Sequence, residues 1–353
     1  MVRYGMSSTG QIQERSRLNS LPILLAGILV LAAACSYEAA EQRPESFSLK
    51  VNVDLVVLNV SVVDEKGTNV TSLRKEDFAV YEDDVQQEVS DFLPVEAPFS
   101  LVLALDTSIS TRSSLSLIKK AASNFTDQLR PSDRIAISEI NSSVRGVQDF
   151  TSDRRKLKQA IDRIETAVGG GSRIYDGVAE AARRVQKAEG GRKAVIVLSD
   201  GMENSSGIRF EDLRRLLAQS DVVFYPVTIL NKGSQKDLLE DFIKRADKRK
   251  AELASYVENA KVSLSVLEEV YQIQTERLQT LTDETGGKIF LVGDLSDLAE
   301  EYAKVAHELR NTFSLAYYSK NTDRDGTMRK IRVEVKNPRY RVRSRTSYFV
   351  QKD

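Results

Sequence analysis

The stretch SLVLALDTSIS at residues 100–110 decides the fold class, because a continuous apolar run ends there in an aspartate and several hydroxyl side chains. The stretch AVIVLSDG at residues 194–201 repeats this arrangement. Further strand patterns and helical patterns alternate around these two stretches, with strands at 134–140, 222–229 and 288–292 and helices at 115–129, 154–165, 174–188, 210–219 and 297–310. Continuous apolar strands alternating with helices predict an α/β fold, a doubly wound and mostly parallel sheet covered by helices on both faces.

Oxygen-bearing side chains gather at the expected ends of these strands. Asp106, Ser108 and Ser110 follow the first strand, Ser172 follows a run of glycines before a helix, and Asp200 follows the strand at 194–198. Ligands of doubly wound sheets bind at the carboxyl ends of the strands. Carboxylates and hydroxyls, without a nitrogen or sulfur donor, suit a small hard cation such as Mg²⁺. The sequence therefore predicts a metal site at this edge of the sheet.

The three loops resemble the metal-ion-dependent adhesion site of von Willebrand factor type A (VWA) domains. The first loop of that family reads Asp-x-Ser-x-Ser, which Asp106, Ser108 and Ser110 match. The second supplies a Thr after a glycine pair, replaced here by Ser172, and the third supplies an Asp, matched by Asp200. The resemblance implies a VWA domain over residues 98–318. It also implies a bound Mg²⁺ (or Mn²⁺ or Ca²⁺), with the three serines nearest the metal and the two aspartates acting largely through bound water.

In this family a protein partner completes the metal site with an acidic side chain, so the resemblance implies a protein-binding function. Three flanking stretches, LRKEDFAVYEDD at 73–84, IYDG at 174–177 and LSDGMENSS at 198–206, also resemble VWA-related lipoproteins of acidobacteria. A Ser in place of Thr at position 172 keeps the hydroxyl but loses the methyl group that restricts its rotation, so we expect weaker metal affinity.

The N-terminus reads as an export signal. Basic residues precede an apolar run at 21–34, which ends in three alanines directly before Cys35. This pattern predicts a signal peptide over residues 1–34. The small residues before the chain's single cysteine resemble the lipobox of bacterial lipoproteins, which implies lipidation of Cys35, and Ser36 implies an outer-membrane location facing the periplasm, or the cell surface. The alternatives are ordinary cleavage after Ala34 and an uncleaved anchor.

Two β segments flank the predicted α/β domain, after a polar tether at residues 35–46. Residues 47–95 contain short strand patterns, and residues 328–351 return to a strand pattern with no helix to cover it. Each segment is too short to bury a core of its own. We expect the two segments to pair into one small β domain.

Residues 234–285 contain no Gly or Pro and carry apolar residues at helical spacing. A single helix of this length would span roughly 75 Å. The next strand of the sheet must nevertheless be reached, so we expect a helical hairpin inserted at about 234–275, turning near 255–259. It forms either a solvated arm or an arm that binds a partner or a second copy; the sequence leaves the oligomeric state open.

Composition excludes several functions. The 51 Lys and Arg residues balance 51 Asp and Glu residues, so the chain has no net positive charge that would attract nucleic acid. One Cys and one His exclude Cys/His zinc clusters and any Ser-His-Asp triad without His307. A metal-dependent phosphatase-like hydrolase is an alternative, but such enzymes need a second Asp where Ser108 stands. We therefore expect no enzyme; a structural lipoprotein with an empty site is the remaining alternative.

Overall fold

The computed structural model describes residues 55–167, 171–189, 191–200, 202–229, 239–240, 243–244, 254–293 and 295–352. The expected signal peptide, the tether, Cys35 and the beginning of the N-terminal β segment lie outside these residues. No helix within the described ranges is long and apolar enough to cross a lipid bilayer.

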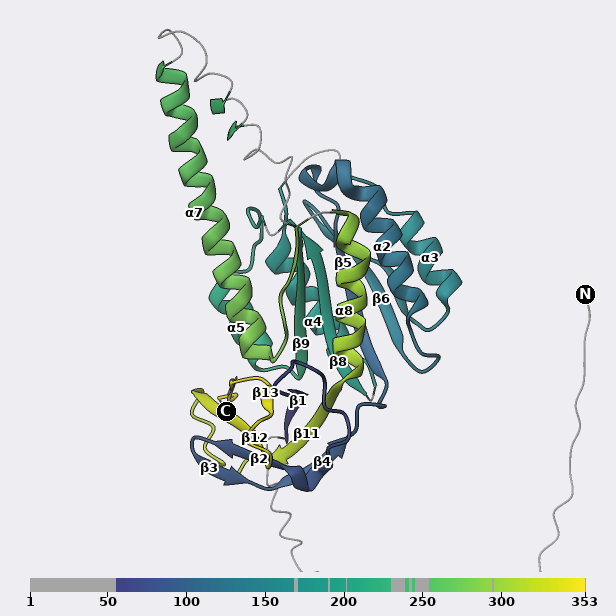
Figure 1. Ribbon diagram of the computed structural model, residues 1–353, viewed down its shortest axis with the longest axis vertical. Helices are drawn as coiled ribbons and strands as arrows, with labels where there is room; N and C mark the ends of the chain where they lie inside the picture. Colours follow the sequence, from purple (N-terminus) through teal and green to yellow (C-terminus); the bar gives the residue numbers. More distant parts are fainter. Residues whose placement is uncertain are drawn as a thin grey trace, which may run out of the picture. The chain divides into compact units, whose positions relative to one another are not determined.

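A six-stranded sheet with the order β10-β9-β8-β5-β6-β7 forms the centre of the α/β domain (Figure 1). All neighbouring strands run parallel except β6 and β7, which are antiparallel. The bounds in chain order are β5 (Phe99–Asp106), β6 (Arg134–Ile140), β7 (Val144–Thr151), β8 (Arg192–Ser199), β9 (Val222–Ile229) and β10 (Phe290–Val292). This architecture confirms the predicted mostly parallel α/β sheet.

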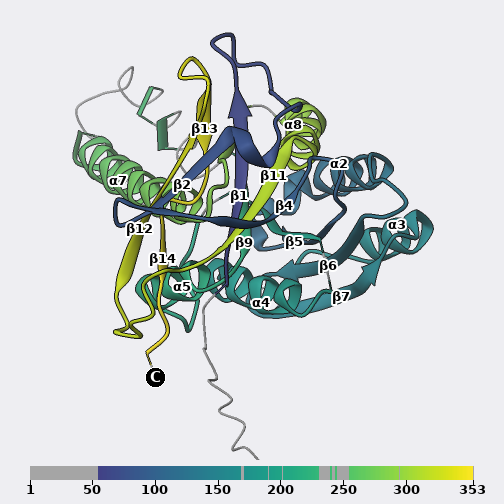
Figure 2. The same ribbon diagram turned by 90° about the horizontal axis from the view of Figure 1, so that it is seen from below.

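Helices cover both faces of this sheet, as Figure 2 shows end-on. Helices α2, α3 and α8 pack on one face, and α4, α5 and α7 on the other. Short 3₁₀ turns η2 and η4 precede α2 and α8. The bounds are η2 (Ile109–Ser114), α2 (Leu115–Asp127), α3 (Arg154–Asp162), α4 (Ile174–Gln186), α5 (Phe210–Ala218), α7 (Ala254–Thr285), η4 (Leu295–Asp297) and α8 (Leu298–Arg310).

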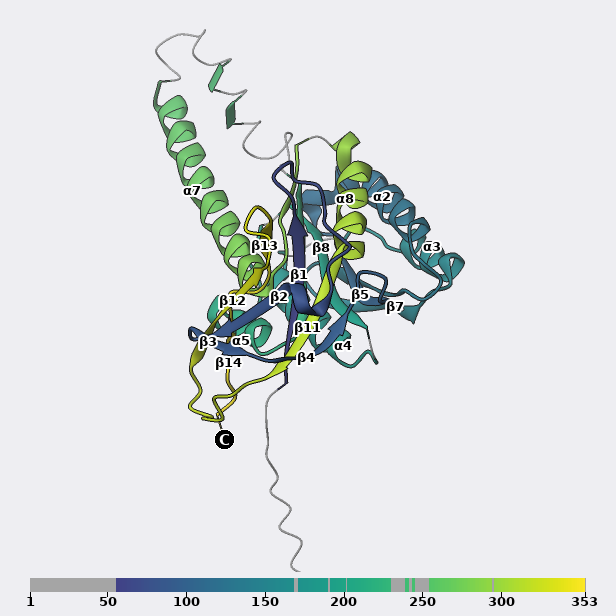
Figure 3. The same ribbon diagram turned by 60° about the horizontal axis from the view of Figure 1, so that its bottom comes forward.

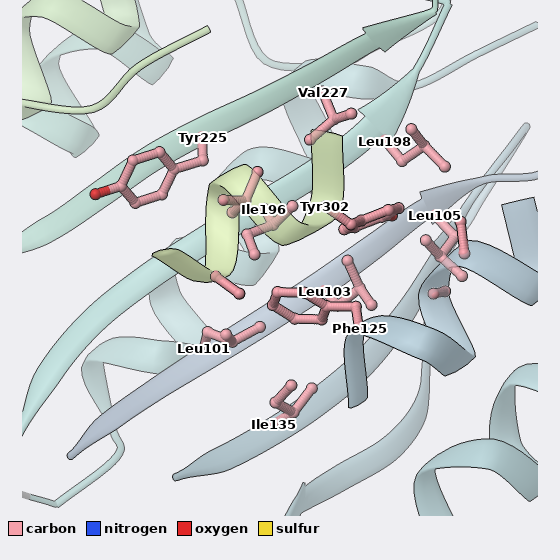
Figure 4. Packing of buried hydrophobic residues seen from close by; sticks show 14 of the residues in the cluster. Leu101, Leu103, Leu105, Phe125, Ile135, Ile196, Leu198, Tyr225, Val227 and Tyr302 are labelled. Carbon is pink, nitrogen blue, oxygen red and sulfur yellow. The ribbon is translucent and has the colours of Figure 1, made fainter. Parts of the chain in front are cut away.

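The apolar runs of the sequence are continuous because both faces of the central strands are buried. Alternate residues of a strand point to opposite faces. In β5, Leu101, Leu103 and Leu105 face α2, α3 and α8, whereas the residues between them face α4. Phe125 of α2 and Tyr302 of α8 meet over the first face, with ring centroids 5.4 Å apart (Figure 4). Removing such a buried side chain costs about 2–5 kcal/mol, so these positions fix the strand that carries Asp106.

Two four-stranded antiparallel sheets form a β sandwich beside the α/β domain (Figure 3). Their strand orders are β13-β1-β11-β4 and β14-β12-β2-β3, and apolar side chains from both sheets form one core. The bounds are β1 (Leu55–Val63), η1 (Lys75–Asp77), β2 (Phe78–Glu82), β3 (Val85–Gln87), β4 (Val89–Leu93), β11 (Thr312–Tyr318), β12 (Met328–Val335), β13 (Arg341–Arg343) and β14 (Ser347–Phe349). The expected flanking β domain of N- and C-terminal segments is therefore present.

One expected domain boundary needs correction. The VWA domain was expected to reach residue 318, but β11 lies in the sandwich, between β1 and β4. The reason is pairing: β1 has antiparallel partners at every position from Leu55 to Ser61 along β11. The chain thus passes directly from α8 into the centre of the sandwich sheet.

Buried arginines join the sandwich to the α/β domain. The Arg345 guanidinium donates to the carbonyl of Ala218, the last residue of α5, at 2.6 Å and to that of Ser220, two residues later, at 2.8 Å. Arg192, in β8, donates to the carbonyl of Thr312 at the start of β11. Carbonyls at a helix C-terminus lack intrahelical partners, so Arg345 both satisfies them and anchors the C-terminal segment.

Helix α7 forms the second part of the expected insertion. Its last turns pack on the sheet through Leu278 and Leu281, and its beginning extends well past the sheet (Figure 1). The turn expected at residues 255–259 is wrong, because these residues lie inside one continuous helix of 32 residues. The first arm of the expected hairpin lies outside the described residues except for 239–240 and 243–244, which are helical.

Candidate metal centre

Asp106 is the innermost of the predicted site residues. It ends β5 and is completely buried. Its Oδ1 accepts a hydrogen bond from the backbone N–H of Ser108 at 2.9 Å, and its Oδ2 accepts one from the Ser199 hydroxyl at 2.7 Å. Because β5 and β8 are adjacent parallel strands, Ser199 arrives from the end of the neighbouring strand. Both carboxylate oxygens are therefore held in fixed directions.

Asp200 lies next to this carboxylate and is only 4% exposed. Burial and, to a smaller extent, the negative charge of Asp200 together raise the pKa of Asp106 from 3.8 to about 6. The hydrogen bonds from Ser199 and Ser108 oppose the increase. Two carboxylates buried side by side are costly to ionise in water-poor surroundings, and a cation between them removes that cost.

The first loop is folded onto the end of β6. The backbone N–H of Thr107 donates to the carbonyl of Ile140 at 2.8 Å, and the Asn141 side chain donates to the Thr107 hydroxyl at 3.1 Å. The Thr111 hydroxyl donates to the carbonyls of Asp106 and Ser108 at 3.1 and 3.0 Å. Ser108 is 4% exposed. These bonds hold the Asp-x-Ser segment in one conformation at the strand end.

The second loop is clamped to the third. The Ser172 N–H donates to the Asn204 side-chain oxygen at 2.9 Å, and the Asn204 N–H donates back to the Ser172 carbonyl at 3.2 Å. Ser172 is 3% exposed. A Cβ at Gly171 would lie 2.0 Å from the Asn204 side-chain oxygen and 1.9 Å from the Ser205 hydroxyl. Only glycine therefore fits at position 171 while Asn204 holds Ser172.

The carboxylates of Glu203 and Asp176 hold the second and third loops in shape through hydrogen bonds with backbone N–H groups. The Glu203 carboxylate accepts hydrogen bonds from the N–H groups of Tyr175, Ser205 and Ser206 at 2.8–2.9 Å. The Asp176 carboxylate accepts from the N–H groups at 207 and 208, which lowers the pKa of Asp176 although burial alone would raise it. The second and third loops consequently form one hydrogen-bonded unit.

The structure brings Asp106, Ser108 and Asp200 together at the carboxyl edge of β5 and β8, and it ties Ser172 to the loop that follows Asp200. The side chain of Ser110 and the backbone of residues 168–170 and 201 lie outside the described residues. His307 is elsewhere: its Nδ1 lies 3.1 Å from the Asn69 side-chain nitrogen, beyond β1 of the sandwich.

The donor set fits a small divalent cation. Within the described ranges no three His, Cys, Asp or Glu side chains group so that they could hold a metal ion. Any ion here would therefore rely on hydroxyl oxygens beside the Asp106 and Asp200 carboxylates. Oxygen-only donors of this kind suit Mg²⁺, Mn²⁺ or Ca²⁺ better than a softer metal.

Several residues of the site were not singled out from the sequence. Ser199 and Asn141 follow the rule that polar side chains gather at the carboxyl ends of parallel strands, so that rule could have found them. Glu203 and Asn204 stand in the acidic and polar stretch after Asp200. No spacing signal identifies them, because their role depends on how the third loop folds back onto the second.

Comparison with known proteins agrees with this geometry. Residues 100–272 match the von Willebrand factor type A domain. A protein of Borreliella burgdorferi described as uncharacterized is 24% identical over 208 residues, which are 57% of this chain and 55% of that protein. The chain thus spans about half the length of this curated relative.

Solved structures resemble the chain more distantly. A von Willebrand factor type A protein from Catenulispora acidiphila is 12% identical, covers 85% of this chain and 74% of its own, and has a TM-score of 0.44. Proximal thread matrix protein 1 from the mussel byssus, solved with a zinc-occupied MIDAS motif, is 16% identical, covers 65% and 50%, and has a TM-score of 0.46. The family match and the strand-end site agree that this chain contains a von Willebrand factor type A domain.

Proposed function

We propose that the protein binds another protein through a divalent cation held by Asp106, Ser108, Ser110, Ser172 and Asp200. VWA domains often mediate protein–protein interaction through a metal-ion-dependent adhesion site. Mg²⁺ is the proposed ion, with Mn²⁺ and Ca²⁺ as the other hard cations that suit these donors. An acidic side chain of the partner fills the position that the protein leaves open on the ion.

The observation that carries this proposal is the pair of buried carboxylates, Asp106 and Asp200, at the ends of adjacent strands. Their mutual repulsion favours a cation between them, and the Ser108 and Ser199 side chains form hydrogen bonds with the Asp106 carboxylate at the same strand end. A cation that is only partly neutralised by the chain attracts an incoming carboxylate strongly once water is excluded. The donor geometry therefore supports metal-dependent recognition of an acidic partner.

We further propose that the chain is exported and anchored in the cell envelope through lipidated Cys35, in the outer membrane or at the cell surface. The support comes from the sequence: an export signal whose small residues end at the chain's single cysteine. The N-terminal strands of the sandwich, which begin with β1 at Leu55, would then lie between the anchor and the VWA domain along the chain.

The same site favours binding over catalysis. A phosphatase-like reaction at Asp106 needs a general acid beside the nucleophile, and the residue two positions later is Ser108. The single histidine contacts Asn69 rather than the metal loops. We therefore propose a non-enzymatic function.

A pull-down from envelope extract tests the proposal. The full chain is used as bait in Mg²⁺ and again in EDTA, beside the variants Ser172→Ala and Glu180→Gln. Glu180 is an exposed residue of α4 and serves as the control. We expect a partner that is retained in Mg²⁺ by the wild type and by Glu180→Gln, and lost in EDTA or with Ser172→Ala. Equal retention under all four conditions would contradict metal-dependent binding.

A further inference from the structure

Helix α7, whose last turns pack on the central sheet through Leu278 and Leu281, also reaches the metal loops through a buried glutamine. The seam of α7 repeats at alternating spacings of four and three residues and is otherwise filled by Ala, Leu and Tyr, at positions 260, 264, 267, 271, 278 and 281. Gln274 occupies the seam position between 271 and 278 and is 9% exposed. A buried amide is costly unless both of its ends are hydrogen-bonded, so this position calls for an explanation.

Both ends of the Gln274 amide form hydrogen bonds, one with the first turn of α4, which follows the second loop, and one with the third loop. Its Nε2 donates to the carbonyl of Glu203 in the third loop at 3.2 Å, and its Oε1 accepts from the Tyr175 hydroxyl at 3.1 Å. A backbone carbonyl can only accept, so the nitrogen must face Glu203 and the oxygen must face Tyr175. The orientation of the amide is thus fixed by its partners.

These contacts close a ring that contains a proposed metal ligand. The Tyr175 N–H donates to the Glu203 carboxylate at 2.9 Å. Tyr175 stands three residues after Ser172, and Glu203 directly precedes Asn204, which holds Ser172 through two hydrogen bonds. Gln274 therefore connects the two sides of the clamp around Ser172 without touching the ion itself.

We propose that Gln274 is a positioning residue for the metal site, holding the second and third loops together so that the Ser172 hydroxyl points at the ion. This inference rests on the proposed metal-binding function. It gives α7 a role beyond packing, because Gln274 connects this helix to Tyr175 and Glu203.

Three variants and a matched control test this role. Gln274→Met keeps the volume and the helix propensity but removes both hydrogen bonds, and Tyr175→Phe removes only the hydroxyl. The double variant reports whether the two residues act together. Gln272→Ala is the control, since Gln272 lies on the same helix, is exposed, and donates a hydrogen bond to the Glu276 side chain at 2.9 Å.

Two measurements are made on the full chain: the Mg²⁺ dissociation constant by calorimetry, and amide hydrogen exchange of residues 171–177 and 202–208 in EDTA. We expect Gln274→Met to weaken Mg²⁺ binding about fivefold, which corresponds to the net loss of one hydrogen bond, and to speed exchange in both loops. Tyr175→Phe should act in the same direction, and the double variant should be less than additive. Gln272→Ala should change neither quantity.

The outcomes separate this inference from the proposed function. If the wild type binds Mg²⁺ and Gln274→Met binds it equally tightly with unchanged exchange, Gln274 merely satisfies its own burial and the inference is wrong. If the wild type binds no Mg²⁺, the proposed function fails, and the exchange data alone decide whether Gln274 holds the loops. If Gln274→Met does not fold, Tyr175→Phe decides by the same two criteria.

Discussion

Replacing Asp106 by asparagine should stabilise the metal-free protein at neutral pH while abolishing its response to Mg²⁺. The Asp106 carboxyl is completely buried, and its pKa rises from 3.8 to about 6 because of burial and the neighbouring Asp200. At about 1.4 kcal/mol per unit of pKa, that difference corresponds to about 3 kcal/mol of lost folding stability at pH 7. Asn removes this charge but disturbs the Ser199 hydrogen bond, at a cost of about 1 kcal/mol. The expected net gain is about 2 kcal/mol.

The pH dependence follows from the same values. Well below pH 3.8 the carboxyl is protonated in both the folded and the unfolded chain, so it does not lower the stability. Between about 4 and 6 the unfolded chain ionises before the folded one, and the stability of the metal-free wild type falls by up to about 1.4 kcal/mol per pH unit. Above pH 6 the loss is complete and constant. Asp106→Asn lacks this slope, so its advantage should vanish near pH 4.

Urea unfolding in EDTA at pH 7.5 and at pH 4, repeated with Mg²⁺ at pH 7.5, measures these effects. Asp84→Asn is the control, because the Asp84 side chain is 93% exposed and its positive φ of 65° suits asparagine. Mg²⁺ should raise the stability of the wild type and of the control, and leave Asp106→Asn unchanged. If Asp106→Asn is less stable than the wild type in EDTA at pH 7.5, the reasoning about the paired carboxylates is refuted.

Three further changes have defined outcomes. Cys35→Ala should release the protein from the membrane fraction or leave its precursor unprocessed, and mass spectrometry of an unmodified mature N-terminus in the wild type would rule lipidation out. Gly171→Ala should weaken Mg²⁺ binding by about tenfold or more, because the new Cβ would lie 2.0 Å from the Asn204 side-chain oxygen that holds the second loop. An unchanged Mg²⁺ dissociation constant in calorimetry would contradict the role of Asn204 in holding this loop. Glu82→Gln should lower the free energy of unfolding in urea by about 3 kcal/mol. The reason is that the buried Arg329 guanidinium, which lies 3.1 Å from the Glu82 carboxylate, loses its counter-ion. A decrease below about 1 kcal/mol would argue against that ion pair.

The sequence predicts the α/β domain well where both faces of a strand are buried. The stretches 101–105 and 194–198, which precede Asp106 and Ser199, are apolar throughout, so their pattern differs from that of a surface strand. Strand β7 was not predicted, because it lies at the sheet edge, alternates poorly and pairs irregularly with β6. An edge strand of this kind lacks the burial that produces a recognisable pattern.

The helical conformation of the insertion was predicted from the sequence, but the position of its turn was not. Residues 255–259 carry an Asn and a Ser, which are weak helix breakers, and nothing stronger interrupts α7. Gln274 also went unnoticed, because a lone polar residue in a seam is a small deviation from the pattern. Only its contacts with Tyr175 and Glu203 distinguish it from the exposed Gln272.

The positions of three of the proposed metal ligands at the strand ends could be predicted from the sequence, whereas the hydrogen bonds around a fourth could not. The carboxyl ends of parallel strands meet at one edge of the sheet, so the positions of Asp106, Ser108 and Asp200 can be predicted without knowing the conformation of the loops. The clamp around Ser172 could not be predicted, because Asn204 reaches it only after the third loop turns back. Long-range hydrogen bonds between loops have no fixed spacing in the sequence.

Isothermal titration of Mg²⁺ into the full chain and its Asp200→Ala variant tests the central claim most directly. Asp200 supplies the second buried carboxylate, and its removal takes away the charge that opposes ionisation of Asp106 without emptying the core, since it follows the last residue of β8. The account predicts a single saturable Mg²⁺ site in the wild type and no saturable heat in the variant. Identical binding isotherms for the two proteins would contradict it.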